Sequence, residues 1–124
     1  MSIHLRKDME NLKKQLFLLS GRVEQNLANA VKAVESRNAE LAETVIGSDS
    51  DIDDMEVKIE EECLKILALH QPVAIDLRII TAMIKINNDL ERVGDEAVNI
   101  AERVIAMSAQ PQATINFDYR LMAE

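Results

Sequence analysis

Hydrophobic residues recur along most of the chain at alternating steps of three and four, the spacing that forms one buried stripe on an α-helix. The first such stretch predicts a helix over residues 2–35. Asn26 is the one polar residue in its stripe, whose apolar positions are Leu5, Met9, Leu12, Leu16, Leu19, Val23, Ala30 and Ala33. The break that follows contains Ser36 and Asn38, and either side chain suits the N-cap of a second helix.

A second stripe predicts a helix over residues 39–69. Its positions are Leu41 or Ala42, Val45, Ile52, Met55, Ile59, Cys63 and Ile66. The stripe keeps its phase through Gly47 and Ser48, so we expect one continuous helix, although an interior glycine is unfavourable by about 1 kcal/mol relative to alanine. Pro72 should end this helix, because proline disfavours helical geometry at the residue before it.

A third stripe, the most regular of the three, predicts a helix over residues 73–108. Its positions are Ile79, Met83, Ile86, Leu90, Val93, Ala97, Ile100, Val104 and Met107. We expect Pro72 or Val73 at the first helical position and Asp76 in the first turn, where the helix dipole favours a negative charge. A second apolar set lies away from this stripe, and we expect another domain or subunit to cover it: Ile80, Ile84, Val98, Ala101 and Ile105. The alternative is that these aliphatic residues are simply exposed.

Three long helices predict an all-α fold, an antiparallel three-helix bundle formed by residues 1–109. Three glycines and two prolines are too few for a turn-rich β fold, and 48% hydrophobic residues suffice for a core. Residues 110–124 fit a linker and the start of a fourth helix, capped by Asn116 or Asp118. We therefore expect the chain to be part of a larger protein.

Composition narrows the classes of function. A net charge of −8 argues against nucleic acid as a partner, because phosphate binding requires clustered Lys and Arg. The lone Cys63 cannot form an internal disulfide and is expected to be a buried small residue, and with no signal peptide in view a cytoplasmic location is expected. No apolar run approaches the roughly 20 residues of a membrane span, so any membrane association should go through a partner.

The third helix carries a candidate metal site. Glu91, Asp95 and Asn99 are spaced four apart, which places three oxygen-bearing side chains on one helix face, with Glu102 nearby. Hard cations prefer several carboxylate oxygens at once, and Gly94 removes a side chain beside the site. The pattern alone favours a solvated acidic face, because Glu and Asp four residues apart are common on helices.

An acidic run on the second helix allows two interpretations. A calcium-binding loop beginning at Asp49 is rejected, because Asp54 occupies the position that requires glycine and the helical stripe continues through the run. On a helix, a ridge forms beside the core stripe from Asp49, Asp53, Glu56 and Glu60. We expect this ridge to face Lys85 or Arg92 in a structural role, with a further metal ligand as the alternative.

Two other polar features concern single residues. Asp89 is expected on the core side of the third helix, where Arg22 or Lys32 should pair with it. His4 and His70 are isolated in the sequence and do not form the Glu-x-x-His pattern of di-iron bundles.

Two segments carry a resemblance to a known family. Residues 71–78, QPVAIDLR, and residues 89–100, DLERVGDEAVNI, resemble the PhoU family of regulators of bacterial phosphate uptake. The resemblance extends to the second helix at Asp49, Ile52, Met55, Glu56, Ile59 and Glu60. It implies tandem three-helix bundles with acidic Glu/Asp-x-x-x-Asp motifs that hold metal ions in some members. Glu91 and Asp95 match that motif, and Asn99 matches its downstream asparagine.

The resemblance also implies a function. A PhoU-like chain would be a negative regulator of the phosphate-starvation response, an adaptor between the phosphate ABC transporter ATPase and a sensor histidine kinase. It would be cytoplasmic, peripheral to the inner membrane through these partners, and not an enzyme. Its acidic surface would bind iron, zinc, nickel or a similar ion. Because only one copy of the repeat is present, a second copy of the chain is expected to complete a homodimer.

Alternative functions are a metal-binding or metal-storage helical bundle, a metal-dependent enzyme, or a purely structural coiled-coil module. Enzymes and storage bundles usually direct carboxylates from several helices, together with His ligands, into the core. Here the candidate ligands lie opposite the core stripe and the chain has two histidines, so the adaptor is favoured.

Overall fold

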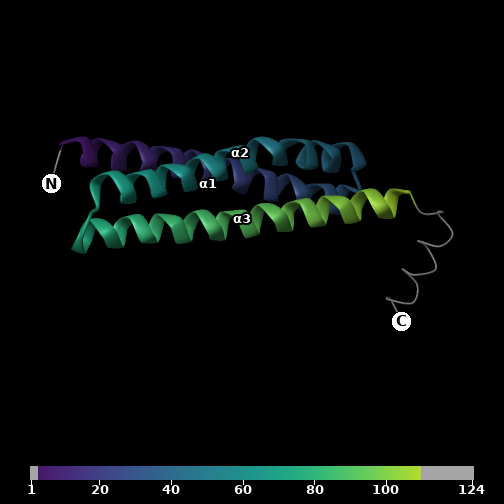
Figure 1. The fold of residues 1–124 in the computed structure, drawn as a ribbon. Helices are drawn as coiled ribbons and strands as arrows, with labels where there is room; N and C mark the ends of the chain where they lie inside the picture. Colours follow the sequence, from purple (N-terminus) through teal and green to yellow (C-terminus); the bar gives the residue numbers. More distant parts are fainter. Residues whose placement is uncertain (1–2, 110–124) are drawn as a thin grey trace.

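The computed structural model describes residues 3–109 and contains three long helices, α1 Ile3–Ser36, α2 Ala39–His70 and α3 Ala74–Ser108 (Figure 1). Each predicted boundary lies within one residue of the observed one, and the helix through Gly47 is continuous. The all-α prediction is confirmed, with no strand in the described range. The expected linker and fourth helix at 110–124 lie outside the described residues.

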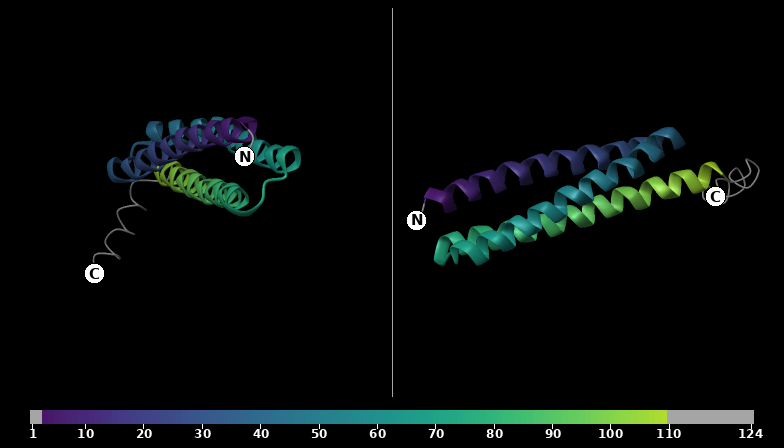
Figure 2. Two further views of the ribbon diagram at one scale, coloured as in Figure 1. Left: turned by 90° about the vertical axis from the view of Figure 1, so that its left-hand side faces the viewer. Right: turned by 45° about the horizontal axis from the view of Figure 1, so that its top comes forward.

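The helices form an elongated bundle in which neighbours along the chain run antiparallel (Figure 2). Each helix packs against both others. The short connections favour this arrangement, because helices joined by two or three residues usually pack as antiparallel neighbours. Within residues 3–109, no helix combines the length and apolar character that a membrane span requires.

Polar groups fix the turns between helices. Asn38 is the N-cap of α2, and its side-chain oxygen accepts a hydrogen bond from the Leu41 N–H at 3.1 Å. Gln71 ends α2 in a left-handed conformation, with its N–H donating to the Leu67 carbonyl. Val73 is extended, so α3 begins at Ala74 and not at Pro72 or Val73 as expected. The left-handed Gln71 and the extended Val73 separate the two helices, and Ala74 starts α3 with a positive φ of 54°.

The core has two parts along the bundle. The first contains large aliphatic side chains, among them Leu12, Leu19, Ile59, Ile66 and Ile80. The second is built mainly from small residues, Ala30, Ala33, Ala42, Val45, Ala97, Ala101 and Val104. Every position of the predicted α1 stripe is buried, Asn26 included, and the Asn26 side-chain amide donates to the Val45 carbonyl at 3.1 Å. Cys63 is buried in the first part, as expected.

The predicted core face of α3 is wrong by a partial rotation of the helix. Ile80, expected on an uncovered side, is fully buried, whereas Ile86 of the predicted stripe is 45% exposed. Ile84 and Ile105, both half-buried, pack against the two parts of the core and Ala101 is buried, so the bundle itself covers most of the second apolar set, with Val98 half-buried. The centre of the buried face contains Asn87 and Gly94, positions that a search for hydrophobic residues passes over.

This rotation also changes the environment of Asp89. It is exposed and does not lie on the core side of α3 as expected. Arg22 instead forms an ion pair with Asp51 of α2 at 3.7 Å, and Lys32 forms none within the described range. Asp89 therefore needs no buried partner, because its carboxylate stays in water.

Candidate metal centre

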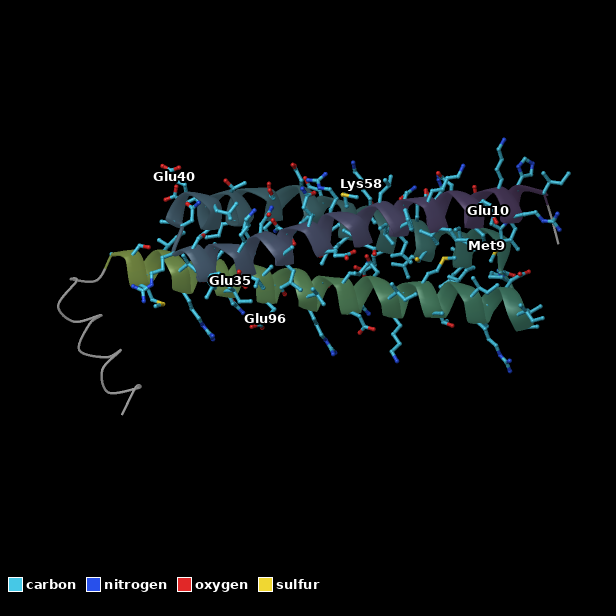
Figure 3. The ribbon with its side chains drawn as sticks, turned by 180° about the vertical axis from the view of Figure 1, so that it is seen from behind. Met9, Glu10, Glu35, Glu40, Lys58 and Glu96 are labelled. Atoms are coloured by element: carbon cyan, nitrogen blue, oxygen red, sulfur yellow. The ribbon has the colours of Figure 1, made fainter. Side chains whose placement is uncertain are left out.

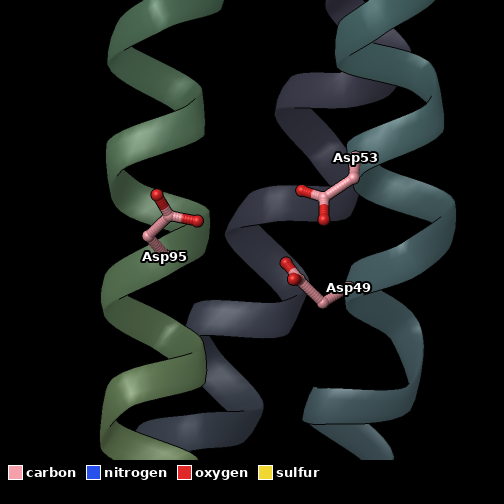
Figure 4. Close-up of side chains that lie close together, drawn as sticks. All are labelled: Asp49, Asp53 and Asp95. Atoms are coloured by element: carbon pink, nitrogen blue, oxygen red, sulfur yellow. The ribbon is translucent and has the colours of Figure 1, made fainter.

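Carboxylates from two antiparallel helices meet on one side of the bundle. Asp49 and Asp53 of α2 and Asp95 of α3 each offer an oxygen, and these three oxygens lie within 4.8 Å of one another (Figure 4). We call these three residues the carboxylate cluster. Asp49 is half-buried, and the other two are exposed. Oxygens on opposite sides of a bound cation lie about 4 to 5 Å apart, so the spacing suits one ion.

Helix geometry explains why the cluster forms. Asp49 and Asp53 are one turn apart, so both project from the same side of α2. Asp95 follows Gly94, which is buried against α2. A Cβ atom added at Gly94 would lie 3.7 Å from Glu56 Oε1 and 3.9 Å from Ile52 Cγ2. Gly94 therefore lies against Glu56 and Ile52 of α2, at a distance that a methyl group would fill.

Buried oxygens without hydrogen-bond donors occur in the cluster, on Asp49, and on Glu56 and Asn87 between α2 and α3. Glu56 is only 6% exposed, and its Oε1 has no hydrogen-bond partner. The Asn87 side-chain amide donates to the Glu56 backbone carbonyl at 3.1 Å, but the Asn87 Oδ1 and the Asp49 Oδ1 are likewise without partners. Buried acceptors are usually satisfied, so this group is short of positive charge or hydrogen-bond donors.

The pKa values of two of these carboxyl groups also indicate a shortage of positive charge. Burial raises the pKa of Asp49 to about 6, with the charge of Asp53, a hydrogen bond to Asp53 and the charge of Asp95 adding to the effect. Burial also raises the pKa of Glu56 to about 7, and the charges of Asp53, Glu91, Asp95 and Asp49 contribute in that order. Like charges in close proximity disfavour ionisation. A bound cation would relieve this repulsion at neutral pH.

The predicted ligands lie at different places relative to the cluster. Asp95 belongs to it, and Glu91 lies near enough to Glu56 for its charge to raise that pKa. Asn99 is exposed and is not among the three clustered residues. Asp49 and Asp53, which the sequence offered as metal ligands only in the alternative interpretation of the α2 ridge, form the α2 side of the cluster. Their own Asp-x-x-x-Asp spacing, equal to that of Glu91 and Asp95, is the sequence signal that could have identified them.

The structural role predicted for the α2 ridge is wrong. Its acids face acidic residues of α3, and neither Lys85 nor Arg92 forms an ion pair within residues 3–109. The rotation of α3 is the reason, because it turns these two cations toward solvent, where both are exposed. The ridge is therefore not neutralised by protein side chains.

The donor set consists of oxygen atoms. His70 contacts Asp8 at 3.0 Å near the C-terminal end of α2, away from the cluster (Figure 3 shows the side chains along the bundle). His4 is exposed, and burial raises the pKa of the Cys63 thiol within the core. Carboxylate oxygens suit hard cations such as Mg²⁺, Ca²⁺ and Mn²⁺. The residues present therefore fit a hard ion held between α2 and α3.

Comparison with known proteins identifies the family. The model of the PhoU domain matches residues 16–104, a span that contains the carboxylate cluster and Glu56. The chain belongs to the PhoU family. The resemblance noted in the sequence is thereby confirmed over most of the chain.

Several named PhoU relatives are similar to this chain. The phosphate-specific transport system accessory protein PhoU homolog of Aquifex aeolicus is 42% identical over 118 residues, covering 95% of this chain and 53% of that protein. PhoU of Escherichia coli K12 is 36% identical over 103 residues, 83% of this chain and 43% of that protein. PhoU homolog 1 of Thermotoga maritima is 37% identical over 112 residues, 87% of this chain and 47% of that protein. The chain thus spans about half the length of these relatives.

Proposed function

We propose that this chain is a PhoU-type negative regulator of the phosphate-starvation response. Its membership of the PhoU family supports this role, as do relatives named as accessory proteins of the phosphate-specific transport system. The chain acts by binding and not by catalysis, as an adaptor between the ATPase of the phosphate ABC transporter and a sensor histidine kinase. It works in the cytoplasm and reaches the membrane through these partners.

A metal ion held by the carboxylate cluster is the second part of the proposal. The observation that carries it is the approach of three carboxylates from two helices to within 4.8 Å, beside buried oxygens that have no donors. Asp49, Asp53 and Asp95 would hold the ion, and Glu91, one turn before Asp95 on α3, is the candidate for a further oxygen. The ion would neutralise the acidic face and clamp α2 to α3. Iron, zinc and nickel remain candidates beside the harder ions that the donor set favours.

A cell-based assay tests the regulatory role. The chain is expressed in a bacterium that lacks its own PhoU protein and carries a reporter driven by a phosphate-starvation promoter. In phosphate-rich medium we expect the chain to lower reporter activity. A reporter that stays high although the chain accumulates would contradict the regulatory role.

The same assay separates the metal site from the regulatory role. We expect the double variant Asp53→Asn, Asp95→Asn to lose most of the repression. Asp89→Asn and Asp54→Asn are matched controls, because both alter exposed acids outside the carboxylate cluster. If the double variant represses the reporter as strongly as the unaltered chain, the regulatory role remains supported. The metal site would then have no part in regulation.

A further inference from the structure

A row of apolar residues runs along α3 beside the buried core. Its members are seven residues apart and are half-buried or exposed: Ile79, Ile86, Val93, Ile100 and Met107. Ile86 and Met107 are 45% and 48% exposed. A repeat of seven is the spacing with which a helix keeps one seam against a neighbouring helix over many turns. The packing of the three helices on one another leaves this seam only partly covered.

The neighbouring side of α1 is apolar as well. A groove of about 410 Å³ lies between the two helices, where Phe17 and Ser20 of α1 and Ile79 of α3 are among its lining residues. Phe17 is 80% exposed. Val31 and Val34, both exposed, follow Phe17 and Ser20 by fourteen residues, so they continue the same side of α1. We call the α3 row together with Phe17, Val31 and Val34 the α1–α3 face.

The net charge of the chain is concentrated on α2. This helix contains ten of the 22 acidic residues and two of the 14 basic residues, so the remainder of the chain contains twelve of each. Two copies that each carry a net charge of −8 repel one another least when their α2 helices point away from the contact. The α1–α3 face meets this condition, because it is formed by the two helices other than α2.

The charges beside the α1–α3 face have both signs. On α3 six charged side chains are exposed near the row: Arg78, Lys85, Asp89, Arg92, Glu96 and Arg103. None of the six forms an ion pair within residues 3–109. In an interface between identical copies, residue i of one copy contacts residue j of the other, so a basic residue can meet an acidic one. A second copy therefore offers a partner to charges of either sign, which a uniformly acidic or basic partner does not.

The α1–α3 face is large enough for a stable dimer. From Ile79 to Met107 the row extends about 42 Å along the helix, at 1.5 Å per residue. Two adjacent helices are together about 18 Å wide, so the face measures about 750 Å². A standard protein interface removes about 800 Å² of surface from each partner. The size of the face thus matches what one copy must bury.

We propose that two copies of the chain associate through the α1–α3 face, with Phe17, Ile86 and Val93 buried in the contact. This gives the homodimer expected from the sequence a specific surface. The face shares no residue with the carboxylate cluster, which lies between α2 and α3. Association therefore depends neither on a bound metal ion nor on the proposed regulatory role.

Sedimentation velocity over a series of protein concentrations tests the proposal. We expect the mass to rise with concentration from the 13.9 kDa of one chain to twice that value. Phe17→Glu and Ile86→Glu should each raise the dissociation constant of the dimer at least about tenfold, because each buries a carboxylate in an apolar contact. A chelator should leave the dimer intact.

Two variants of α2 are matched controls. Val57→Glu and Leu64→Glu also replace exposed apolar residues and add the same negative charge, but they lie outside the α1–α3 face. They should change the dissociation constant by less than about twofold. Circular dichroism checks that all four variants keep their helical content, which is expected because the altered side chains are exposed in the single bundle.

Three results would overturn the proposal. A chain that stays monomeric up to about 1 mM does not use an interface of this size, and the face then belongs to a different partner. A dimer that is unaffected by Phe17→Glu and Ile86→Glu, or is weakened equally by the α2 controls, forms through another surface. A dimer that a chelator dissociates is held together by metal ions and not by the α1–α3 face.

Discussion

Glu56 is a buried carboxyl group that has acidic neighbours and no hydrogen-bond partner for its Oε1. Burial, together with neighbouring carboxylates, raises its pKa from an ordinary 4.5 to about 7 in the folded bundle. Between these values the folded protein holds a proton that the unfolded chain has released. The stability contributed by the protonated carboxyl is therefore complete below about pH 4.5 and is lost as the pH rises through about 7. Asp49, whose pKa is raised to about 6, acts in the same direction.

Glu56→Gln should remove most of this dependence in the metal-free protein. The amide needs no proton, so at about pH 8 we expect the free energy of unfolding to rise by on the order of 1–2 kcal/mol. Near pH 5 the change should be small. Urea denaturation in the presence of a chelator measures both values, and Glu60→Gln is the exposed control on α2. Equal changes at both pH values would contradict the raised pKa.

A second prediction at the residue scale concerns the stability of a variant at Gly94. A Cβ atom there would meet Glu56 and Ile52 at ordinary contact distances of 3.7 and 3.9 Å. Gly94→Ala should therefore keep the bundle intact and stabilise it by up to about 1 kcal/mol, as expected for a helix interior.

Gly47→Ala is the matched control, since a Cβ at Gly47 meets nothing within 4 Å. Thermal denaturation compares the two variants. Destabilisation by Gly94→Ala beside stabilisation by Gly47→Ala would mean that α3 approaches α2 more closely than described.

At the scale of elements, periodicity was sufficient for the helices and insufficient for the orientation of one of them. On α1 the predicted stripe is the buried one, although exposed apolar residues such as Phe17, Leu18 and Val34 lie beside it. On α3, two neighbouring apolar sets offer two core faces, and counting hydrophobic residues cannot choose between them. The observed face is centred on Asn87, which donates a hydrogen bond to the Glu56 carbonyl of α2, and on Gly94, which lies against Glu56 and Ile52.

Two isoleucines of α3 distinguish these faces by stability. Ile80 is fully buried, so Ile80→Ala should destabilise the bundle by about 2–4 kcal/mol through lost burial and a cavity. Ile86→Ala, at a 45% exposed position, should cost under about 1 kcal/mol. Urea unfolding of both variants provides the measurement. If Ile86→Ala destabilised the bundle more than Ile80→Ala, the core face of α3 would be the one that the hydrophobic stripe predicts.

At the scale of the whole molecule, the candidate site was predictable only in part. The spacing of Glu91 and Asp95 indicates a carboxylate pair on one helix, and Asp49 and Asp53 repeat it on another. Which pairs face each other depends on the register of α2 against α3 and on the rotation of α3. Neither quantity is encoded in the spacing along one helix, so the cluster emerges only when the three helices are packed.

An ion between α2 and α3 should stabilise the entire bundle. A ligand that binds only the folded state at 100 times its dissociation constant adds about 2.7 kcal/mol. We expect Mn²⁺ to raise the melting temperature at about pH 7.5 and to have less effect near pH 5, where protons compete for Asp49 and Glu56. Differential scanning fluorimetry measures both shifts. A larger shift at the lower pH would contradict carboxylate ligation.

Isothermal titration calorimetry with Mn²⁺ shows whether carboxylates of α2 and α3 hold one ion between them. Asp53→Asn and Asp95→Asn should each weaken binding by about tenfold or more, and Asp89→Asn should leave it unchanged. The double variant should lose less than the sum of the two single losses, because both residues bind the same ion. If the Asp53→Asn and Asp95→Asn variants bind Mn²⁺ as tightly as the unaltered chain, then these two carboxylates do not hold the ion.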